Sequence, residues 1–336
     1  MEALKFRLTK PYLSSEEARA VQEVLNSGWL AEGTVTAQFE RKLASIVGAK
    51  YAVAVCNCTV ALELALKAHQ VKGAVAIPDF THPATALAVI NAGVEPILCD
   101  VSLETYNLQI NDSWVDYPET SVPVSWGGNP LTEYPHSLII EDAACSLGAS
   151  NVGSDHTSCF SFHPRKLVTT GEGGAVTTND RRIAEKIRGL KTFGLGGGNY
   201  KLNDIAASIG LAQLAKLKQI IKTRRRMAKV YSELLEDNSD VIVPIQKGGT
   251  YQTYAVHLLK GKRDRIILDL AKKGIETQIG TYALHLLPQF QSLHKCGKLS
   301  NSTLLFRNLL ALPMAYDLTE ENQKTVVTEL CRCLNE

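Results

Sequence analysis

No stretch of this 336-residue sequence is apolar for long enough to cross a bilayer, and its N-terminal segment lacks the apolar core of a secretory signal. Charge of one sign is not in excess either, because 36 basic and 34 acidic side chains give a formal net charge of +2. This balance is unlike that of proteins that wrap nucleic acid. We therefore expect a cytoplasmic protein with neither a membrane nor a nucleic-acid partner, which holds any bound anion by local contacts.

Paired cysteines with the spacing of a zinc site are also missing. The eight cysteines are spread along the chain, and the two closest pairs, Cys56/Cys58 and Cys331/Cys333, are each separated by one residue rather than two. Several lie in apolar segments that resemble strands. The sequence thus predicts reduced, partly buried thiols and no metal site.

What is present is an alternation of strand-like and helical segments. The strand-like segments are YAVAVC, AVAIP, EPILCD and HSLIIED, and ALELALKAHQ and ATALAVINAG are helical. Start and stop signals frame an earlier helix between Ser14 and Gly28, and a second helix ends at Gly48. This alternation predicts an α/β fold with a mainly parallel sheet sandwiched by helices. The residues after Cys56, Ile77, Asp100 and Ile140 are then expected to converge on one site, because ligands bind beyond the carboxyl ends of parallel strands.

The second half of the chain predicts a smaller unit. A long helical segment follows Thr178, and the pattern breaks between Asp237 and Pro244. Short strand-like segments and helices alternate from there to the end. We expect a large cofactor-binding domain over residues 1–237 and a small C-terminal α+β domain over residues 238–336.

The segment SFHPRKLVTTGEGGAVTTND, which begins at Ser161, contains a candidate nucleophile. Lys166 lies among apolar residues and is followed by glycines that allow a tight turn. A partly apolar pocket disfavours the ammonium form, which would leave an amine able to attack an aldehyde. The alternative is a solvated surface lysine, which is the commoner case for a lysine considered alone.

A carboxylate supplies the second half of this chemistry. Asp142 ends the apolar strand SLIIED, where it would face the site. Pyridoxal phosphate (PLP) needs such an acid, because its protonated ring nitrogen accepts the electrons released when a substrate Cα–H bond breaks. The alternative role for Asp142 is to cap a helix over AACSLGA.

Two further features fit the same cofactor. Cys58 and Thr59 precede a helical segment whose first N–H groups could bind a phosphate, and Ser161 offers a second hydroxyl. Thr59 could instead be a plain helix cap. His82 follows another strand, where its ring could lie against the pyridine ring, or it could be an ordinary hydrogen-bonded histidine.

Together these residues resemble the DegT/DnrJ/EryC1/StrS family of sugar aminotransferases, which are fold-type I PLP enzymes. The resemblance runs over nearly the whole chain and is most specific in FSFHPRKLVTTGEGGAVTTND and GGNYKLNDIAASIGLAQLAKL. It implies a Schiff base between PLP and Lys166, with Asp142 on the ring nitrogen, Thr59 and Ser161 on the phosphate, and His82 against the ring. It also implies a homodimer in which Asn199 reaches the phosphate of the neighbouring subunit.

Three positions depart from the family pattern. Cys58 stands where glycine is usual, so a close backbone approach to the phosphate is less assured. His82 replaces the more usual Phe, Tyr or Trp, which weakens stacking on the cofactor ring but does not forbid it. Cys145 stands where glutamine or histidine commonly contacts the ring hydroxyl, so that hydrogen bond is either missing or made by a thiol.

The resemblance implies a ping-pong transfer through pyridoxamine phosphate. The amino donor is glutamate or glutamine, and the acceptor is a nucleotide-linked 3- or 4-keto-deoxysugar for amino-sugar and polysaccharide biosynthesis. Related dehydratases carry histidine in place of the lysine, so Lys166 favours transamination. The alternatives are a non-catalytic regulator of the same fold, a PLP-dependent sugar dehydratase, and a cyclitol aminotransferase.

The substrate residues are less sharply indicated. Cations available for a substrate diphosphate are Lys191, Lys201 and the run from Arg224 to Arg226, although a basic run on a helix is usually a solvated face. The resemblance places Tyr282 and His285 near the sugar, and Trp29 could line the same cleft. All three could equally be packing residues.

Overall fold

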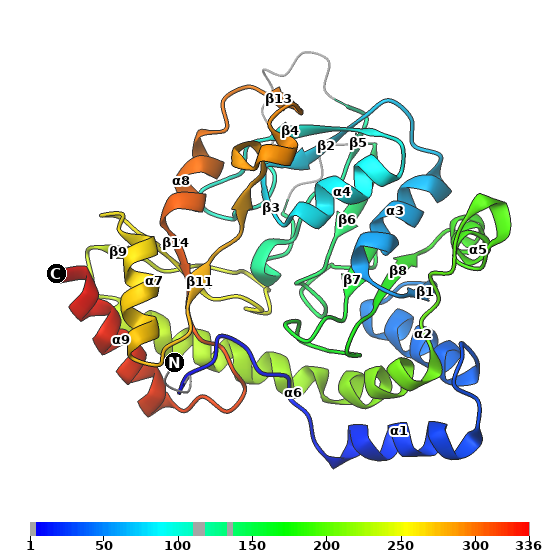
Figure 1. The fold of residues 1–336 in the computed structure, drawn as a ribbon, viewed down its shortest axis with the longest axis horizontal. Coiled ribbons are helices and arrows are strands. Elements are labelled where there is room, and N and C mark those ends of the chain that lie inside the picture. The colour runs from blue at the N-terminus through cyan, green and yellow to red at the C-terminus, as the bar shows by residue number, and fades with distance from the viewer. Residues whose placement is uncertain (1–4, 110–117, 133–136, 336) are drawn as a thin grey trace.

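The structure is a computed structural model that describes residues 5–109, 118–132 and 137–335. Figure 1 shows a large body built on one twisted sheet and a smaller unit beside it, with the long helix α6 running beneath both. None of the helices in these ranges is both long and apolar enough to span a membrane.

The large sheet is mainly parallel. Its eight strands lie in the order β1 (Tyr51–Val55), β8 (Gly174–Thr178), β7 (Thr157–Ser161), β6 (Leu138–Asp142), β5 (Thr120–Ser121), β2 (Ala74–Pro78), β4 (Glu95–Cys99) and β13 (His294–Cys296). β8 is antiparallel to both of its neighbours, and every other pairing is parallel. The predicted α/β fold is therefore confirmed.

Helices cover both faces of this sheet, as Figure 1 shows. They are α1 (Ser15–Ser27), α2 (Thr34–Val47), α3 (Cys58–His69), α4 (Pro83–Asn91), α5 (Arg181–Leu190) and α6 (Asp204–Leu235). Along β1, Val53 and Val55 join one buried cluster and Ala52 and Ala54 join another, so both faces of the strand are covered. A strand buried on both faces reads as a continuous apolar segment, which is why YAVAVC is recognisable in the sequence.

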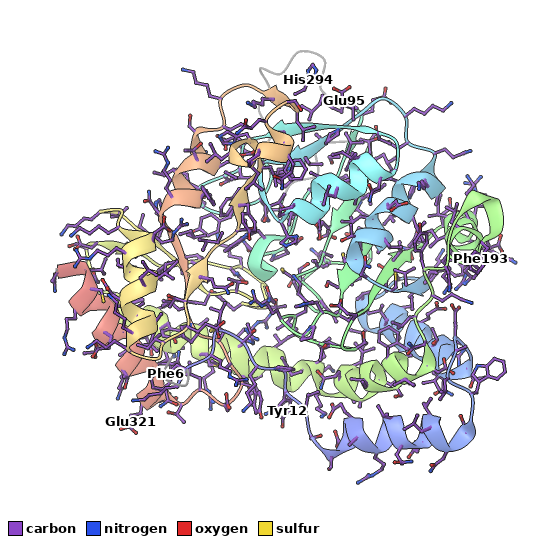
Figure 2. The ribbon with its side chains drawn as sticks, viewed as in Figure 1. Phe6, Tyr12, Glu95, Phe193, His294 and Glu321 are labelled. Atoms are coloured by element: carbon purple, nitrogen blue, oxygen red, sulfur yellow. The ribbon has the colours of Figure 1, made fainter. Side chains whose placement is uncertain are left out.

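The smaller unit is built on an antiparallel sheet in the order β11 (Gln278–Ile279), β14 (Leu309–Ala311), β10 (Ala255–Leu258) and β9 (Val241–Ile242). Its helices are α7 (Arg263–Lys272), α8 (Ser300–Asn308) and α9 (Glu320–Asn335). The second half of α6 packs here through Met227, Tyr231 and Leu235. The N-terminal segment also returns to this unit, because Phe6 pairs with Ile275 (Figure 2).

The C-terminal part also contributes to the large body. β12 (Tyr282–Ala283) pairs with β3 (Phe80–Thr81), and β13 extends the large sheet beside β4. At that edge the His294 ring lies 3.4 Å from the Glu95 carboxylate (Figure 2). The short helices are η1 (Trp126–Gly128), η2 (Gly194–Gly196), η3 (Leu284–Leu286) and η4 (Pro288–Phe290). Strands from the C-terminal part thus pair with strands of the large body. The domain boundary predicted between residues 237 and 238 therefore stays a proposal.

Candidate active site

A cavity of about 650 Å³ lies at the carboxyl edge of the large sheet. Residues that follow three of the predicted strands line it: Cys58 after β1, His82 after β2, and Asp142 at the end of β6. Lys166 lines the same cavity from the segment after β7. The predicted convergence of strand ends is confirmed for these three strands.

The expectation that the segment after Asp100 joins this site is wrong. The Asp100 carboxylate accepts hydrogen bonds from the backbone N–H groups of Asn301 and Ser302 at 2.9 and 2.8 Å, and from the Ser302 hydroxyl at 2.7 Å. It therefore satisfies the first N–H groups of α8, which otherwise lack intrahelical acceptors. This end of β4 is used to attach the C-terminal part.

Asp142 is 6% exposed and is held by hydrogen bonds. One carboxylate oxygen accepts from the Thr85 hydroxyl at 2.8 Å, and the other accepts from the Ala144 N–H at 3.2 Å. Burial raises the pKa of Asp142, while the bonds from Thr85 and Ala144 and the charge of Lys166 oppose that rise. No helix follows in residues 143–149, so the alternative helix-cap role is wrong.

The Lys166 amine is positioned by a tight turn. The Lys166 N–H donates to the His163 carbonyl at 2.8 Å, and the amine nitrogen Nζ lies 3.1 Å from the sulfur of Cys145. Burial lowers the pKa of Lys166, but Cys145, Asp142 and Cys58 outweigh burial and the net pKa is raised. The expectation that the ammonium form is disfavoured is therefore wrong, because the surrounding carboxylate and sulfur atoms stabilise its charge.

The start of α3 provides a possible anion site. Asn57 caps this helix, and its side chain accepts a hydrogen bond from the Val60 N–H at 2.9 Å. The alternative that Thr59 is the cap is therefore wrong. The N–H groups of Cys58 and Thr59 have no acceptor among the described residues, and both residues line the cavity together with Ser161. Unpaired N–H groups at a helix start favour a bound phosphate.

His82 has two contacts at the cavity wall. Its Nδ1 atom accepts a hydrogen bond from the Ala84 N–H at 3.2 Å and so caps α4. Its ring lies edge-to-face with Tyr282 at a centroid distance of 6.2 Å. Burial lowers the pKa of His82, and the charge of Lys166 lowers it further. The ring is therefore neutral near pH 7.

Beside Tyr282, which lines the cavity, lies a histidine–aspartate contact that sequence analysis missed. The His285 ring lies 2.6 Å from the carboxylate of fully buried Asp79, which also accepts the His285 N–H at 2.8 Å. Next to this pair, β12 aligns Tyr282 with Thr81. His285 itself does not line the cavity, so its position fits the alternative of a packing residue.

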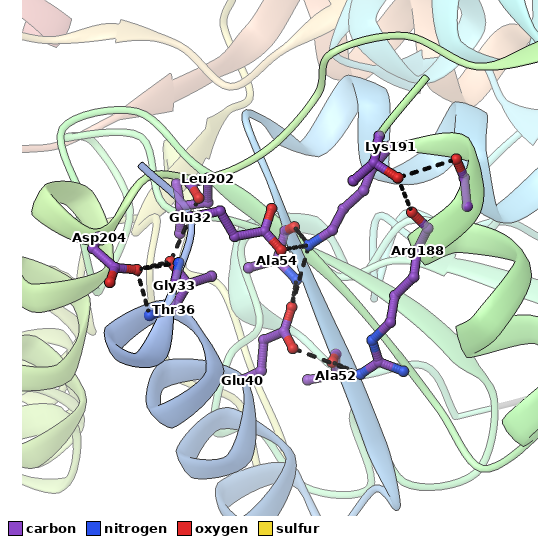
Figure 3. Close-up of polar contacts among 12 residues, drawn as sticks. Glu32, Gly33, Thr36, Glu40, Ala52, Ala54, Arg188, Lys191, Leu202 and Asp204 are labelled. Atoms are coloured by element: carbon purple, nitrogen blue, oxygen red, sulfur yellow. Dashed lines mark hydrogen bonds and ion pairs between the residues drawn. The ribbon is translucent and has the colours of Figure 1, made fainter. Parts of the chain in front are cut away.

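Lys191 is not available to a substrate, contrary to expectation. Its side chain is 2% exposed, and its amine lies 2.8 Å from Glu32 and 3.5 Å from Glu40 (Figure 3). The same amine donates to the Ala54 carbonyl at 2.9 Å. Burial of a lysine requires such partners, and here they fasten the end of α5 to β1 and α2.

Two of the three arginines of the run from Arg224 to Arg226 bind backbone carbonyls of the protein itself, and a phosphate contact of Arg226 stays a prediction. Arg224 is 6% exposed and donates to the Gln252 carbonyl at 2.9 Å. Arg225 donates to the Gly249 carbonyl at 2.8 Å. Arg224 and Arg225 thus attach α6 to the loop before β10.

Trp29, Asn199 and Lys201 lie outside the lining of this cavity. Trp29 is 61% exposed, and Lys201 pairs with Val55 beside the end of β1. The roles expected of these three residues concern a partner subunit or a bound substrate, and they stay predictions.

Sequence analysis missed much of the cavity wall, including three residues that can form hydrogen bonds. They are Arg165, Gln278 and Thr253. Arg165 directly precedes Lys166 in the chain, whereas the fold alone brings Gln278 and Thr253 to the site.

Comparison with known proteins gives consistent matches. The model of the DegT/DnrJ/EryC1/StrS aminotransferase family matches residues 11–114 and 131–331. The chain is 30% identical to the uncharacterized protein MJ1066 of Methanocaldococcus jannaschii, over 97% of each chain. It is 28% identical to the spore coat polysaccharide biosynthesis protein SpsC of Bacillus subtilis, over 94% of each chain. A crystal structure of DesI with its TDP-sugar product superposes with a TM-score of 0.91 at 26% identity, covering 100% of this chain and 94% of that one.

Proposed function

The chain belongs to the DegT/DnrJ/EryC1/StrS aminotransferase family of PLP-dependent enzymes, and we propose that it moves an amino group from glutamate or glutamine to a nucleotide-linked 3- or 4-keto-deoxysugar. The observation that carries this proposal is that Lys166 and Asp142 line one cavity. The names of SpsC and DesI, which refer to a polysaccharide and to a TDP-sugar, support a sugar nucleotide as acceptor.

The cavity fits PLP at each end of the cofactor. Lys166 would attach its aldehyde carbon, and Asp142 would face its ring nitrogen. The unpaired N–H groups of Cys58 and Thr59, with the hydroxyls of Thr59 and Ser161, would hold the phosphate. His82 would lie against the ring, and Cys145 would approach its hydroxyl group.

Bound PLP supplies an electron sink that stabilises the charge left when the donor Cα–H bond breaks. The Nζ atom of Lys166 would remove that proton and deliver it to the aldehyde-derived carbon of the cofactor, acting first as base and then as acid. The carboxylate of Asp142 would stabilise the positive charge on the protonated ring nitrogen of the cofactor. Because the donor leaves before the acceptor enters, the same Nζ atom serves both halves of a ping-pong reaction.

Product analysis tests this proposal. We expect the purified protein, given glutamate and a thymidine-diphosphate-linked or uridine-diphosphate-linked 4-keto-6-deoxysugar, to release the amino sugar. Lys166→Ala should release none, while Lys229→Ala, which changes an exposed lysine on α6, should behave as wild type. A product that has lost water would indicate a dehydratase, and binding without turnover would indicate a regulator; either result would contradict the proposal.

A further inference from the structure

The cavity contains one cation that the reaction described above does not use. Among the described residues of its lining, Lys166 and Arg165 are the two that carry a positive charge at neutral pH. Burial lowers the pKa values of His82 and His163, and the charge of Lys166 lowers both further, so neither ring is charged. Since Lys166 attaches the cofactor, Arg165 is left for an anion of a substrate.

The backbone of Arg165 is fixed on both sides. Its N–H donates to Nδ1 of His163 at 3.1 Å, and its carbonyl accepts from the Gln252 side chain at 2.8 Å. The Arg165 guanidinium reaches across to β11, where one N–H donates to the Gln278 amide oxygen at 2.9 Å. The other guanidinium N–H groups have no acceptor among the described residues.

We infer that Arg165 and Gln278 form the binding site for the carboxylate of the amino donor. This inference rests on the proposed function. A guanidinium offers two parallel N–H groups to a carboxylate, and the Gln278 amide can donate one more. When the donor binds, its carboxylate replaces the Gln278 oxygen as the acceptor for Arg165.

The position of Arg165 next to Lys166 favours the donor carboxylate, rather than the acceptor diphosphate, as the anion that Arg165 binds. Arg165 directly precedes Lys166, whose Nζ atom works at the donor Cα, and the donor carboxylate is bonded to that same carbon. The diphosphate of a sugar nucleotide is attached to a different sugar carbon from the one that is aminated. An anion site next to the reacting amine therefore suits the donor.

The competing explanation is that Arg165 only fastens the large body to β11. The variant Gln278→Glu separates the two roles. Gln278→Glu would turn the contact with Arg165 into an ion pair. If the contact is only structural, this change leaves donor binding unchanged. A binding role predicts weaker donor binding, because the new carboxylate occupies Arg165 and repels the donor.

The experiment measures binding of 2-methylglutamate to cofactor-loaded protein by calorimetry, since this donor analogue has no Cα proton to lose. We expect Arg165→Gln to weaken binding by about 30-fold or more, because truncating one partner of a charge pair has effects of that size. Gln278→Glu should weaken it as well. Arg332→Gln, which changes an exposed arginine on α9, should bind as wild type. Binding of thymidine diphosphate should be unchanged in all variants.

Wild-type affinity for 2-methylglutamate in Arg165→Gln or in Gln278→Glu would overturn the inference. Weaker binding of thymidine diphosphate with unchanged binding of the amino acid would overturn it too, since it would assign Arg165 to the acceptor. The proposed function is tested separately in the wild type. If glutamate converts the cofactor there while Arg165→Gln retains full donor affinity, only the inference falls.

Discussion

Thr85 is the neighbour that most directly controls the state of Asp142. Its hydroxyl lies 2.8 Å from the Asp142 carboxylate and 3.0 Å from the Thr81 hydroxyl, and both threonines are buried. This hydrogen bond opposes the burial that raises the pKa of Asp142. Thr85 therefore helps to keep a charged carboxylate available for the ring nitrogen.

We predict that Thr85→Val lowers the affinity for PLP about tenfold, since a hydrogen bond to a charged group contributes about 1.5 kcal/mol or more. Valine keeps the shape, so the effect isolates the hydroxyl. The measurement is an absorbance titration of apoprotein with PLP. Thr325→Val on α9, away from the cavity, is the matched control, and equal affinities in the two variants would refute the role of Thr85.

Glu141 is a second buried carboxyl on β6 and faces away from the cavity residues. It accepts hydrogen bonds from the hydroxyls of Ser125 and Ser158 and is 2% exposed. Burial raises its pKa from 4.5 to about 7, although the two serines oppose the rise. Between pH 4.5 and about pH 7, the Glu141 carboxyl therefore stays protonated in the folded protein, whereas it loses its proton in the unfolded chain.

The free energy of unfolding should consequently fall as the pH rises through this window. We predict a shallower fall for Glu141→Gln, which would be more stable than wild type above pH 7 by up to about 3 kcal/mol. Urea unfolding at pH 5 and pH 8 measures this. Identical pH dependence in both proteins would show that Glu141 does not titrate in this range.

At the residue scale, the sequence was informative where a side chain follows a recognisable strand. Asp142, His82 and Cys58 were predicted because strand ends are favoured ligand positions in a parallel sheet. Thr85 and Gln278 could not be predicted, because their partners Asp142 and Arg165 are far away in the chain. Arg165 lies next to Lys166, but its contact with Gln278 depends on the fold. Burial of Lys191 was missed for the same reason.

At the scale of elements, local signals predicted the helices of the large body. Ser14 and Glu17 form a capping box at the start of α1, and Gly28 adopts a left-handed conformation at its end. By contrast, neither the antiparallel direction of β8 nor the addition of β13 to the large sheet was predicted. Strand direction depends on pairing between distant segments, which no local pattern records.

The start of α2 shows how one element stabilises another. Gly33 provides no side-chain cap, and Asp204 at the start of α6 replaces it. The Asp204 carboxylate accepts from the N–H groups of Gly33 at 2.9 Å and Thr36 at 2.8 Å, and from the Thr36 hydroxyl at 2.6 Å (Figure 3). This capping couples α2 and α6, which cover the same face of the sheet.

We predict that Asp204→Ala lowers the free energy of unfolding by about 1–3 kcal/mol, because buried N–H groups lose their acceptor. Urea unfolding should show a lower midpoint with an unchanged slope. Asp237→Ala, an exposed aspartate beyond the end of α6, is the control. A midpoint as high as that of the control would contradict the coupling.

At the scale of the whole molecule, the cavity lies between the large sheet and the C-terminal part. Lys166 and Asp142 come from one side, and Gln278 and Tyr282 come from the other. Large apolar side chains are exposed elsewhere, with Phe193 67% and Trp29 61% exposed. Figure 2 shows Phe193 at the rim of the molecule, in the segment that leads to Asn199. The homodimer with shared sites that the family resemblance implies stays a prediction.

Complementation tests that dimer. If Asn199 reaches the neighbouring cavity, a hybrid of Lys166→Ala and Asn199→Ala subunits contains one site with both changes and one intact site. Random mixing should then restore about one quarter of the wild-type activity, although each variant alone is impaired. Activity equal to the average of the two variants, or a monomer in light scattering, would contradict the shared site.

The attachment of PLP to Lys166 tests the central claim most directly. Purified protein should be treated with PLP and borohydride, digested, and analysed by mass spectrometry. The account predicts that the reduced cofactor is bound to the peptide that contains Lys166, and that Lys166→Ala carries no cofactor at any specific position. A modified peptide elsewhere in the wild type, or no modification at all, would contradict it.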